Sequence, residues 1–239
     1  MTVFVILFII DMVIAVMYAR EGHPVVNLKS FWYKMLASGI FVANGVLSYL
    51  HSDKEKYSVL VLVALVLGLI GDAFLSFEPF VKGENEKRNM MIATVVGALF
   101  FLAGHICYIL AFVEELHIRR AFNLKIFLLA WAAIMLLAVI VKIALRAKLG
   151  KLGFPMLIYA LGLSAMGAQS ICLSLLGFAG NVPMQLLFFT APLLFIISDS
   201  TLGLKFSDNE RFGSLKIRMV TLITYYAAQM LFGLTIQLV

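Results

Sequence analysis

The sequence has 239 residues, of which 63% are hydrophobic and only 13% are charged, and its net charge is +6. A soluble domain carries about 25% charged residues, so this composition excludes a soluble protein and predicts a surface that faces lipid. The 19 lysine and arginine residues are spread through short polar segments rather than gathered with aromatic residues, which argues against nucleic-acid binding.

Eight apolar segments follow one another along the chain, and each is long enough to be considered as a transmembrane helix. They cover approximately residues 3–19, 35–50, 57–77, 90–113, 124–145, 152–177, 182–204 and 215–238. Backbone groups in hydrocarbon must be satisfied within their own segment, and about 20 helical residues cross a bilayer. We therefore expect an all-α integral membrane protein of about eight transmembrane helices, forming a single polytopic domain over residues 1–239. The first segment lacks a basic leader and a cleavage site, so it is interpreted as a span.

The distribution of basic residues predicts how the chain crosses the membrane. The connections after the first, third, fifth and seventh segments carry 14 of the 19 lysine and arginine residues, and those after the second and fourth carry the other 5. The positive-inside rule places the richer set in the cytosol. Both termini are then expected on the opposite side.

Two aspartates lie inside the apolar segments, Asp72 near the end of the third and Asp199 near the end of the seventh. These segments run in the same direction, so both aspartates are predicted toward one membrane face, the cytosolic one by the charge count. A carboxylate at the centre of a span costs about 2.5–3.5 kcal/mol. Two interpretations stay open. Each aspartate reaches water or pairs with Lys34 at a helix end, or the two share a polar cavity as acid and base.

Short matching strings surround the two aspartates. Residues 70–75 read Ile-Gly-Asp-Ala-Phe-Leu, and residues 197–202 read Ile-Ser-Asp-Ser-Thr-Leu. The two segments are four apart and point the same way, which suggests two parallel four-helix halves related about the membrane normal. Such a repeat would bring the aspartates together near the central axis.

Other polar residues recur at helical spacing within the spans and are placed to line the same interior. They are Phe101, His105 and Tyr108 in the fourth segment, Tyr159, Met166 and Gln169 in the sixth, and Thr221, Tyr225 and Gln229 in the eighth. Interhelical hydrogen bonds worth about 0.6 kcal/mol each are the simpler explanation for these stripes. Gly97 and Gly104 are expected to allow close helix packing, and Asp11 is expected to bind a structural partner inside the bundle.

Several kinds of site are excluded by the residues themselves. Of the four histidines, only His105 lies well inside a span, so an intramembrane zinc site with three histidines is ruled out. The sequence has neither a Gly-x-Ser-x-Gly nucleophile elbow nor a phosphate-binding loop.

Four motifs together resemble the YhhN-like lysoplasmalogenase family. They are Gly71-Asp72-Ala73-Phe74-Leu75, Phe101-x-x-x-His105-x-x-Tyr108, Ser198-Asp199-Ser200 and Tyr225-x-x-Ala228-Gln229. They occur in the family's order over roughly Lys34 to Gln229. One position departs from the pattern, because the family often has Lys-Pro at the start of the second span and here Met35 follows Lys34.

The resemblance implies a membrane hydrolase that cleaves the vinyl ether of lysoplasmalogens without a metal or organic cofactor. The substrate would be a lysophospholipid within the bilayer, and the lipid-metabolic role implies the endoplasmic reticulum. We expect Asp72 and Asp199 to be the catalytic acid and base, in an order that the sequence does not assign. Lys34 would receive the lipid phosphate. The remaining predicted substrate-binding residues are His105, Tyr108, Tyr159, Tyr225 and Gln229.

Two other functions fit the same residues. Paired intramembrane aspartates and a possible repeat also suit a small proton-coupled transporter. A family member that binds ether lipids without cleaving them is the second alternative. Neither the oligomeric state nor the head-group preference is predicted by the sequence.

Overall fold

Helices make up nearly all of the computed structural model, which describes residues 2–53, 55–81, 83–145, 153–205 and 213–239. The long helices are α1 (Thr2–Glu21), α2 (Leu28–Leu50), α3 (Lys56–Leu75), α4 (Glu86–Ile118), α5 (Leu124–Ala144), α6 (Gly153–Cys172), α7 (Val182–Lys205) and α8 (Leu215–Thr235). A 3-10 turn, η1 (Glu78–Phe80), follows α3, and a π-helical turn, η3 (Leu173–Gly177), extends α6. The predicted all-α fold of about eight helices is confirmed.

Most of these helices are apolar enough to cross a membrane. Within the described ranges, seven helices meet that condition by length and composition, and α2 does not. Although α2 carries Lys29 and Lys34, it has 23 residues, and its start is fixed by a reciprocal capping box between Asn27 and Ser30. Many large apolar side chains lie exposed along the helices, as expected for a multi-pass protein whose surface faces lipid.

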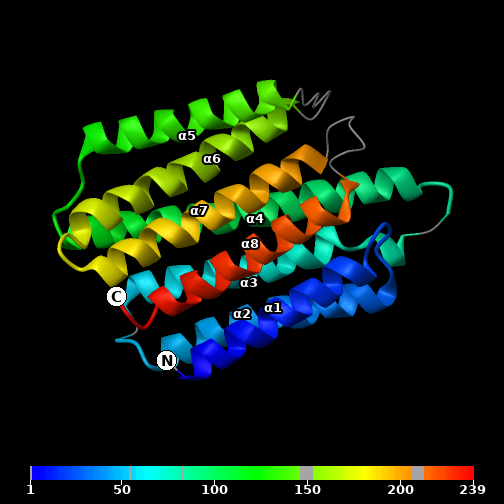
Figure 1. Cartoon of the computed structure of the whole chain (residues 1–239), viewed down its shortest axis with the longest axis horizontal. Coiled ribbons are helices and arrows are strands. Elements are labelled where there is room, and N and C mark those ends of the chain that lie inside the picture. Colours follow the sequence, from blue (N-terminus) through cyan, green and yellow to red (C-terminus); the bar gives the residue numbers. More distant parts are fainter. Residues whose placement is uncertain (1, 54, 82, 146–152, 206–212) are drawn as a thin grey trace.

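The helices form a bundle in which consecutive helices pack side by side, except for α4 and α5 (Figure 1). α8 packs against α1, α2 and α7, and α6 packs against α4, α5 and α7. α5 lies at one edge of the bundle and has no buried residue. The two termini lie at one end, and α1, α3, α5 and α7 all finish at the other.

The predicted repeat of two halves stays a prediction. The packing of α2 against α8 corresponds to the packing of α6 against α4, and both pairs are in contact. α1 and α5 differ from each other, because α1 packs along α8 and buries five residues, whereas α5 buries none. A two-fold relation between the halves therefore describes α2, α4, α6 and α8 better than it describes α1 and α5.

Glycines bring α3 and α4 close together, as the sequence predicts for Gly97 and Gly104. A Cβ atom at Gly97 would lie 3.1 Å from the backbone oxygen of Gly71, and one at Gly104 would lie 3.4 Å from that of Ala64. The close approach places the polar stripe of α4 beside the end of α3 that carries Asp72.

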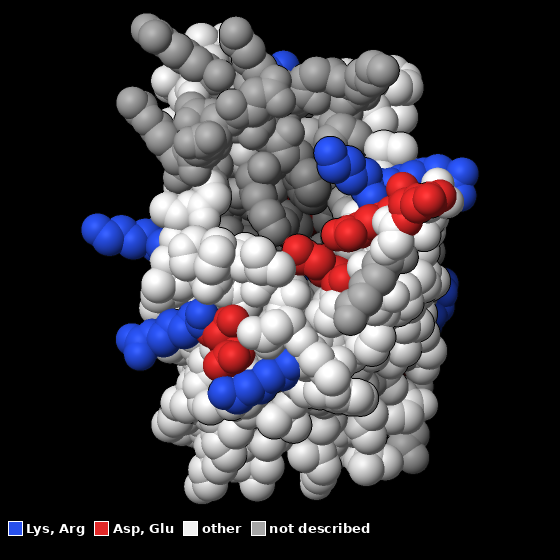
Figure 2. All heavy atoms as spheres, turned by 90° about the vertical axis from the view of Figure 1, so that its right-hand side faces the viewer, with Lys and Arg blue, Asp and Glu red and all other residues white. Residues whose placement is uncertain are grey.

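Figure 2 faces the end of the bundle at which the odd-numbered helices finish, and it shows basic side chains around this end with acidic ones between them. Lys29, Lys87, Arg88 and Lys216 belong to this end. Six of the basic residues in the charge count lie outside the described residues, namely Lys54, Lys82, Arg146, Lys148, Lys151 and Arg211.

Candidate active site

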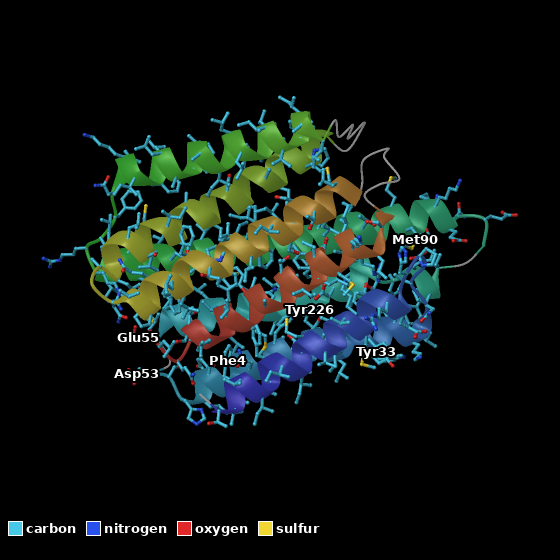
Figure 3. All side chains as sticks on the ribbon, viewed as in Figure 1. Phe4, Tyr33, Asp53, Glu55, Met90 and Tyr226 are labelled. Carbon is cyan, nitrogen blue, oxygen red and sulfur yellow. The ribbon has the colours of Figure 1, made fainter. Side chains whose placement is uncertain are left out.

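A cavity of about 350 Å³ lies at this end of the bundle, and both Asp72 and Asp199 line it. Its wall comes from α1, α2 and the connection between them, from η1, and from α3, α4, α7 and α8. Met90, one of the lining residues, lies at this end in Figure 3. The structure therefore brings the two aspartates to one polar cavity, although they are far apart in the sequence.

Asp72 lies at the centre of a network of donors. Its Oδ1 is 3.0 Å from Nζ of Lys34, and its Oδ2 accepts hydrogen bonds from Ser38 (2.6 Å) and Tyr225 (2.8 Å). The side chains of Lys34 and Asp72 are only 6% and 3% exposed, so water competes little for these contacts. An ammonium group and two hydroxyls stabilise the ionised form of a carboxylate. Asp72 therefore pairs with Lys34 and also lines the cavity that it shares with Asp199.

A second layer of hydrogen bonds holds Tyr225 in place. Tyr108 donates to Oε1 of Gln229 at 2.7 Å, and Nε2 of Gln229 donates to the Tyr225 hydroxyl at 3.2 Å. Tyr108 and Gln229 are buried and lie behind Tyr225 rather than on the cavity wall. The structure therefore favours positioning of Tyr225 over direct substrate contact for these two predicted residues.

Asp199 has different neighbours. The Tyr159 hydroxyl donates to its Oδ2 at 2.5 Å, and Nε2 of His105 lies 3.4 Å from the same oxygen. Both rings also contact each other, with centroids 5.3 Å apart. Among the side chains that the structure describes, no lysine or arginine forms an ion pair with Asp199. The predicted residues His105 and Tyr159 are thus brought to this carboxyl.

Three neighbours of the site were missed by sequence reasoning. Ser38 lies one helical turn after Lys34, a spacing that could have indicated it. Arg218 was counted only as a loop charge, although it lies one and two turns before Thr221 and Tyr225 on α8. Tyr18, near the end of α1, lines the cavity and shares a hydrogen bond of 3.2 Å with Ser76.

The prediction of a structural partner for Asp11 is wrong. Its side chain is completely buried in α1, and neither carboxyl oxygen has a hydrogen-bond partner within the described chain. Gln169 is likewise buried with an unpaired amide oxygen. Among the described residues, no three His, Cys, Asp or Glu side chains lie together in a group that could hold a metal ion.

The model of the YhhN family matches residues 29–236, which include all the predicted site residues and leave α1 outside. No curated protein and no solved structure gives a significant match to the chain.

Proposed function

Since the chain belongs to the YhhN family, which is the lysoplasmalogenase family, we propose that it hydrolyses the vinyl-ether bond of lysoplasmalogens. The products are a fatty aldehyde and glycerophosphoethanolamine or glycerophosphocholine. One observation carries this proposal: two aspartates with different surroundings line one cavity at an end of a membrane bundle.

Hydrolysis of a vinyl ether requires an acid and a second group that stabilises a cation. The acid protonates the outer alkene carbon, which leaves an oxocarbenium ion at the carbon bound to oxygen. Water adds to that carbon and loses a proton, and the resulting hemiacetal collapses to the aldehyde and frees the glycerol hydroxyl. Glycoside hydrolysis passes through a similar cation and also uses two carboxyl groups.

The surroundings of the two aspartates support one assignment of these roles. Asp72 is the carboxylate, because Lys34 and two hydroxyls donate to it, and it stabilises the cation and accepts the proton of the attacking water. Asp199 is the acid. Tyr159 donates to Oδ2 of Asp199, so Oδ1 is the oxygen available to carry the proton.

The remaining cavity wall suits a lipid that enters from the membrane. Leu75, Met90, Phe101, Leu202 and Leu222 add apolar surface beside the two carboxyl groups. A mostly apolar pocket with a few convergent polar groups is the usual form of a small-molecule site. The charge count supports a cytosolic position for this end, and the lipid-metabolic role favours the endoplasmic reticulum membrane.

Aldehyde release by the purified protein in detergent tests the proposal. Asp72→Asn and Asp199→Asn should each lower turnover by about 100-fold or more, since each removes a carboxyl group that transfers a proton. Asp11→Asn is the matched control, because Asp11 is a buried aspartate of the same bundle that does not line the cavity. Near-normal turnover in both cavity variants would overturn the mechanism.

The same assay separates the enzyme from its two rivals. A transporter shows activity only across a sealed membrane, and a lipid-binding protein returns the lysoplasmalogen unchanged. Aldehyde formed in detergent micelles by the wild-type protein excludes both, whereas recovery of intact substrate would reject the hydrolase.

A further inference from the structure

An arginine at the start of α8, Arg218, lines the cavity and forms no ion pair with the acidic side chains that the structure describes. Nε and Nη2 of Arg218 are buried and have no hydrogen-bond partner in the part of the chain that the structure describes. These two nitrogens form one edge of the planar guanidinium group, the edge that binds two oxygens of a phosphate side by side. Burying hydrogen-bond donors without acceptors is costly, and an anion bound at this edge would supply the acceptors.

Lys34 is a weaker candidate for binding that anion than the sequence suggests. Its ammonium group is already 3.0 Å from the Asp72 carboxylate, in a contact that is almost closed to solvent. A lipid phosphate at Lys34 would compete with Asp72. Within the described ranges, Arg218 is not paired in this way, and Glu78, which lines the same cavity, forms no ion pair with it.

The end of α1 holds the guanidinium group in position. Cζ of Arg218 lies 4.7 Å from the centroid of the Tyr18 ring, a cation–π contact, and the Tyr18 hydroxyl is fixed by Ser76. A Cβ atom at Gly22 would collide with Nη2 of Arg218, so the absence of a side chain there makes room for the arginine. Tyr18 and Gly22 both precede residue 29, at which the family match begins.

We propose that Arg218, stacked on Tyr18, binds the phosphodiester of a single-chain glycerophospholipid in this cavity. In such a lipid, the three-carbon glycerol unit separates the phosphate from the first-position ether. A phosphate held at Arg218 therefore leaves the ether directed into the cavity that Asp72 and Asp199 line. This last step, orientation of the bond to be cleaved, rests on the proposed function, whereas phosphate binding does not.

Kinetics with two substrates test the orientation. One is an alkenyl-glycerophosphoethanolamine, and the other is a 1-alkenylglycerol that has the same vinyl ether and no phosphate. Arg218→Gln should raise KM for the first by about tenfold or more with kcat nearly unchanged, and should leave hydrolysis of the second at the wild-type rate. Arg218→Lys, which keeps the charge and loses the fork, should show a smaller rise in KM.

Lys216→Gln is the matched control, since Lys216 is an exposed basic residue two positions earlier on the same helix, and its kinetics should stay at the wild-type level. Equal losses on both substrates in both Arg218 variants would show a structural role and overturn the proposal. So would an unchanged KM for the phospholipid.

Binding without turnover separates the two proposals. A non-cleavable 1-alkyl-glycerophosphoethanolamine should raise the thermal unfolding midpoint of the wild-type protein and should raise that of Arg218→Gln much less. If this holds while no aldehyde is ever formed, the proposed hydrolase fails and the phosphate site stands. If aldehyde is formed but both proteins are stabilised equally, the phosphate site fails. Inorganic phosphate is the second probe, and stabilisation equal to that by the lipid would assign a free-phosphate site and overturn the lipid assignment.

Discussion

Residues of one type take different roles in this bundle because different donors surround them. Asp72 is buried beside an ammonium group, whereas Asp199 contacts a tyrosine hydroxyl and a histidine ring. Asp11 is the third buried aspartate and has no hydrogen-bond partner among the described residues. Burial alone therefore does not distinguish a functional carboxyl group from a costly one, and its partners must be known as well.

Asp11 offers a stability test at a single residue. Replacing it with valine removes two buried polar atoms that the described chain leaves unpaired, and should raise the free energy of unfolding by about 1–3 kcal/mol. Asp11→Asn keeps the shape of the side chain and its unpaired polar atoms, so its free energy of unfolding should change little. Thermal denaturation in detergent, followed by circular dichroism, measures both changes.

A destabilised Asp11→Val protein would contradict this expectation and would indicate that Asp11 has a partner such as a bound water molecule. Loss of aldehyde release in a folded Asp11→Asn protein would instead make Asp11 part of the proton chemistry. The second result would also remove Asp11→Asn as a control for the cavity aspartates.

The sequence predicted those residues of the candidate site that recur at helical spacing or that carry a charge that is costly inside an apolar span. Asp72 and Asp199 were found because carboxylates are expensive inside apolar spans, and His105 and Tyr225 because they share faces with other polar residues. Arg218 was not found, because a basic residue at the end of a span is equally well explained as a determinant of topology. Two of its nitrogens are buried without a hydrogen-bond partner among the described residues. That state depends on tertiary packing, which a local sequence pattern does not show.

At the scale of the helices, the contact between α3 and α4 sets the position of Asp72. A Cβ atom at Gly71 would lie 2.8 Å from the ring of Phe101 and 3.1 Å from the backbone oxygen of Gly97. Gly71→Ala should therefore separate the two helices, lower the thermal unfolding midpoint and reduce aldehyde release, because Asp72 is the next residue.

Gly39→Ala is the matched control for that substitution. Gly39 is also a helical glycine, but a Cβ atom there would meet no atom within 4 Å. The change should be neutral or should stabilise α2 by about 0.5–1 kcal/mol, because alanine favours a helix over glycine. If Gly71→Ala behaved like Gly39→Ala in both assays, close packing would not be what positions Asp72.

Helix positions were largely predictable because each span is a continuous apolar run, but their mutual packing was not. The sequence placed the second span at about residues 35–50, whereas α2 begins at Leu28, where its capping box lies outside the apolar run. The packing of α1 along α8, which brings Tyr18 to Arg218, depends on tertiary contacts. Short connections predict contact between consecutive helices, and even this expectation does not hold for α4 and α5.

For the whole molecule, the number of crossings decides where the cavity opens. Eight crossings place both termini on one side and the cavity on the other, as in Figure 3, where Asp53 and Glu55 lie at the end of the termini and Met90 lies at the cavity end. Seven crossings, the number of described helices that qualify by composition, would separate the termini. α2 is the helix on which this difference depends.

Glycosylation acceptor sites distinguish these arrangements in a protein expressed in endoplasmic reticulum membranes. Acceptors on flexible spacers at each terminus should both be glycosylated, and one inserted at Gly83 in the α3–α4 connection should not, because the positive-inside rule places that connection in the cytosol. Modification only at Gly83 would reverse the orientation and move the cavity to the lumenal side. Modification of a single terminus would mean that α2 does not cross. Lys34 and Ser38 would then leave the membrane-spanning part of the site, and the assignment of Asp72 as the buried carboxylate would fail with them.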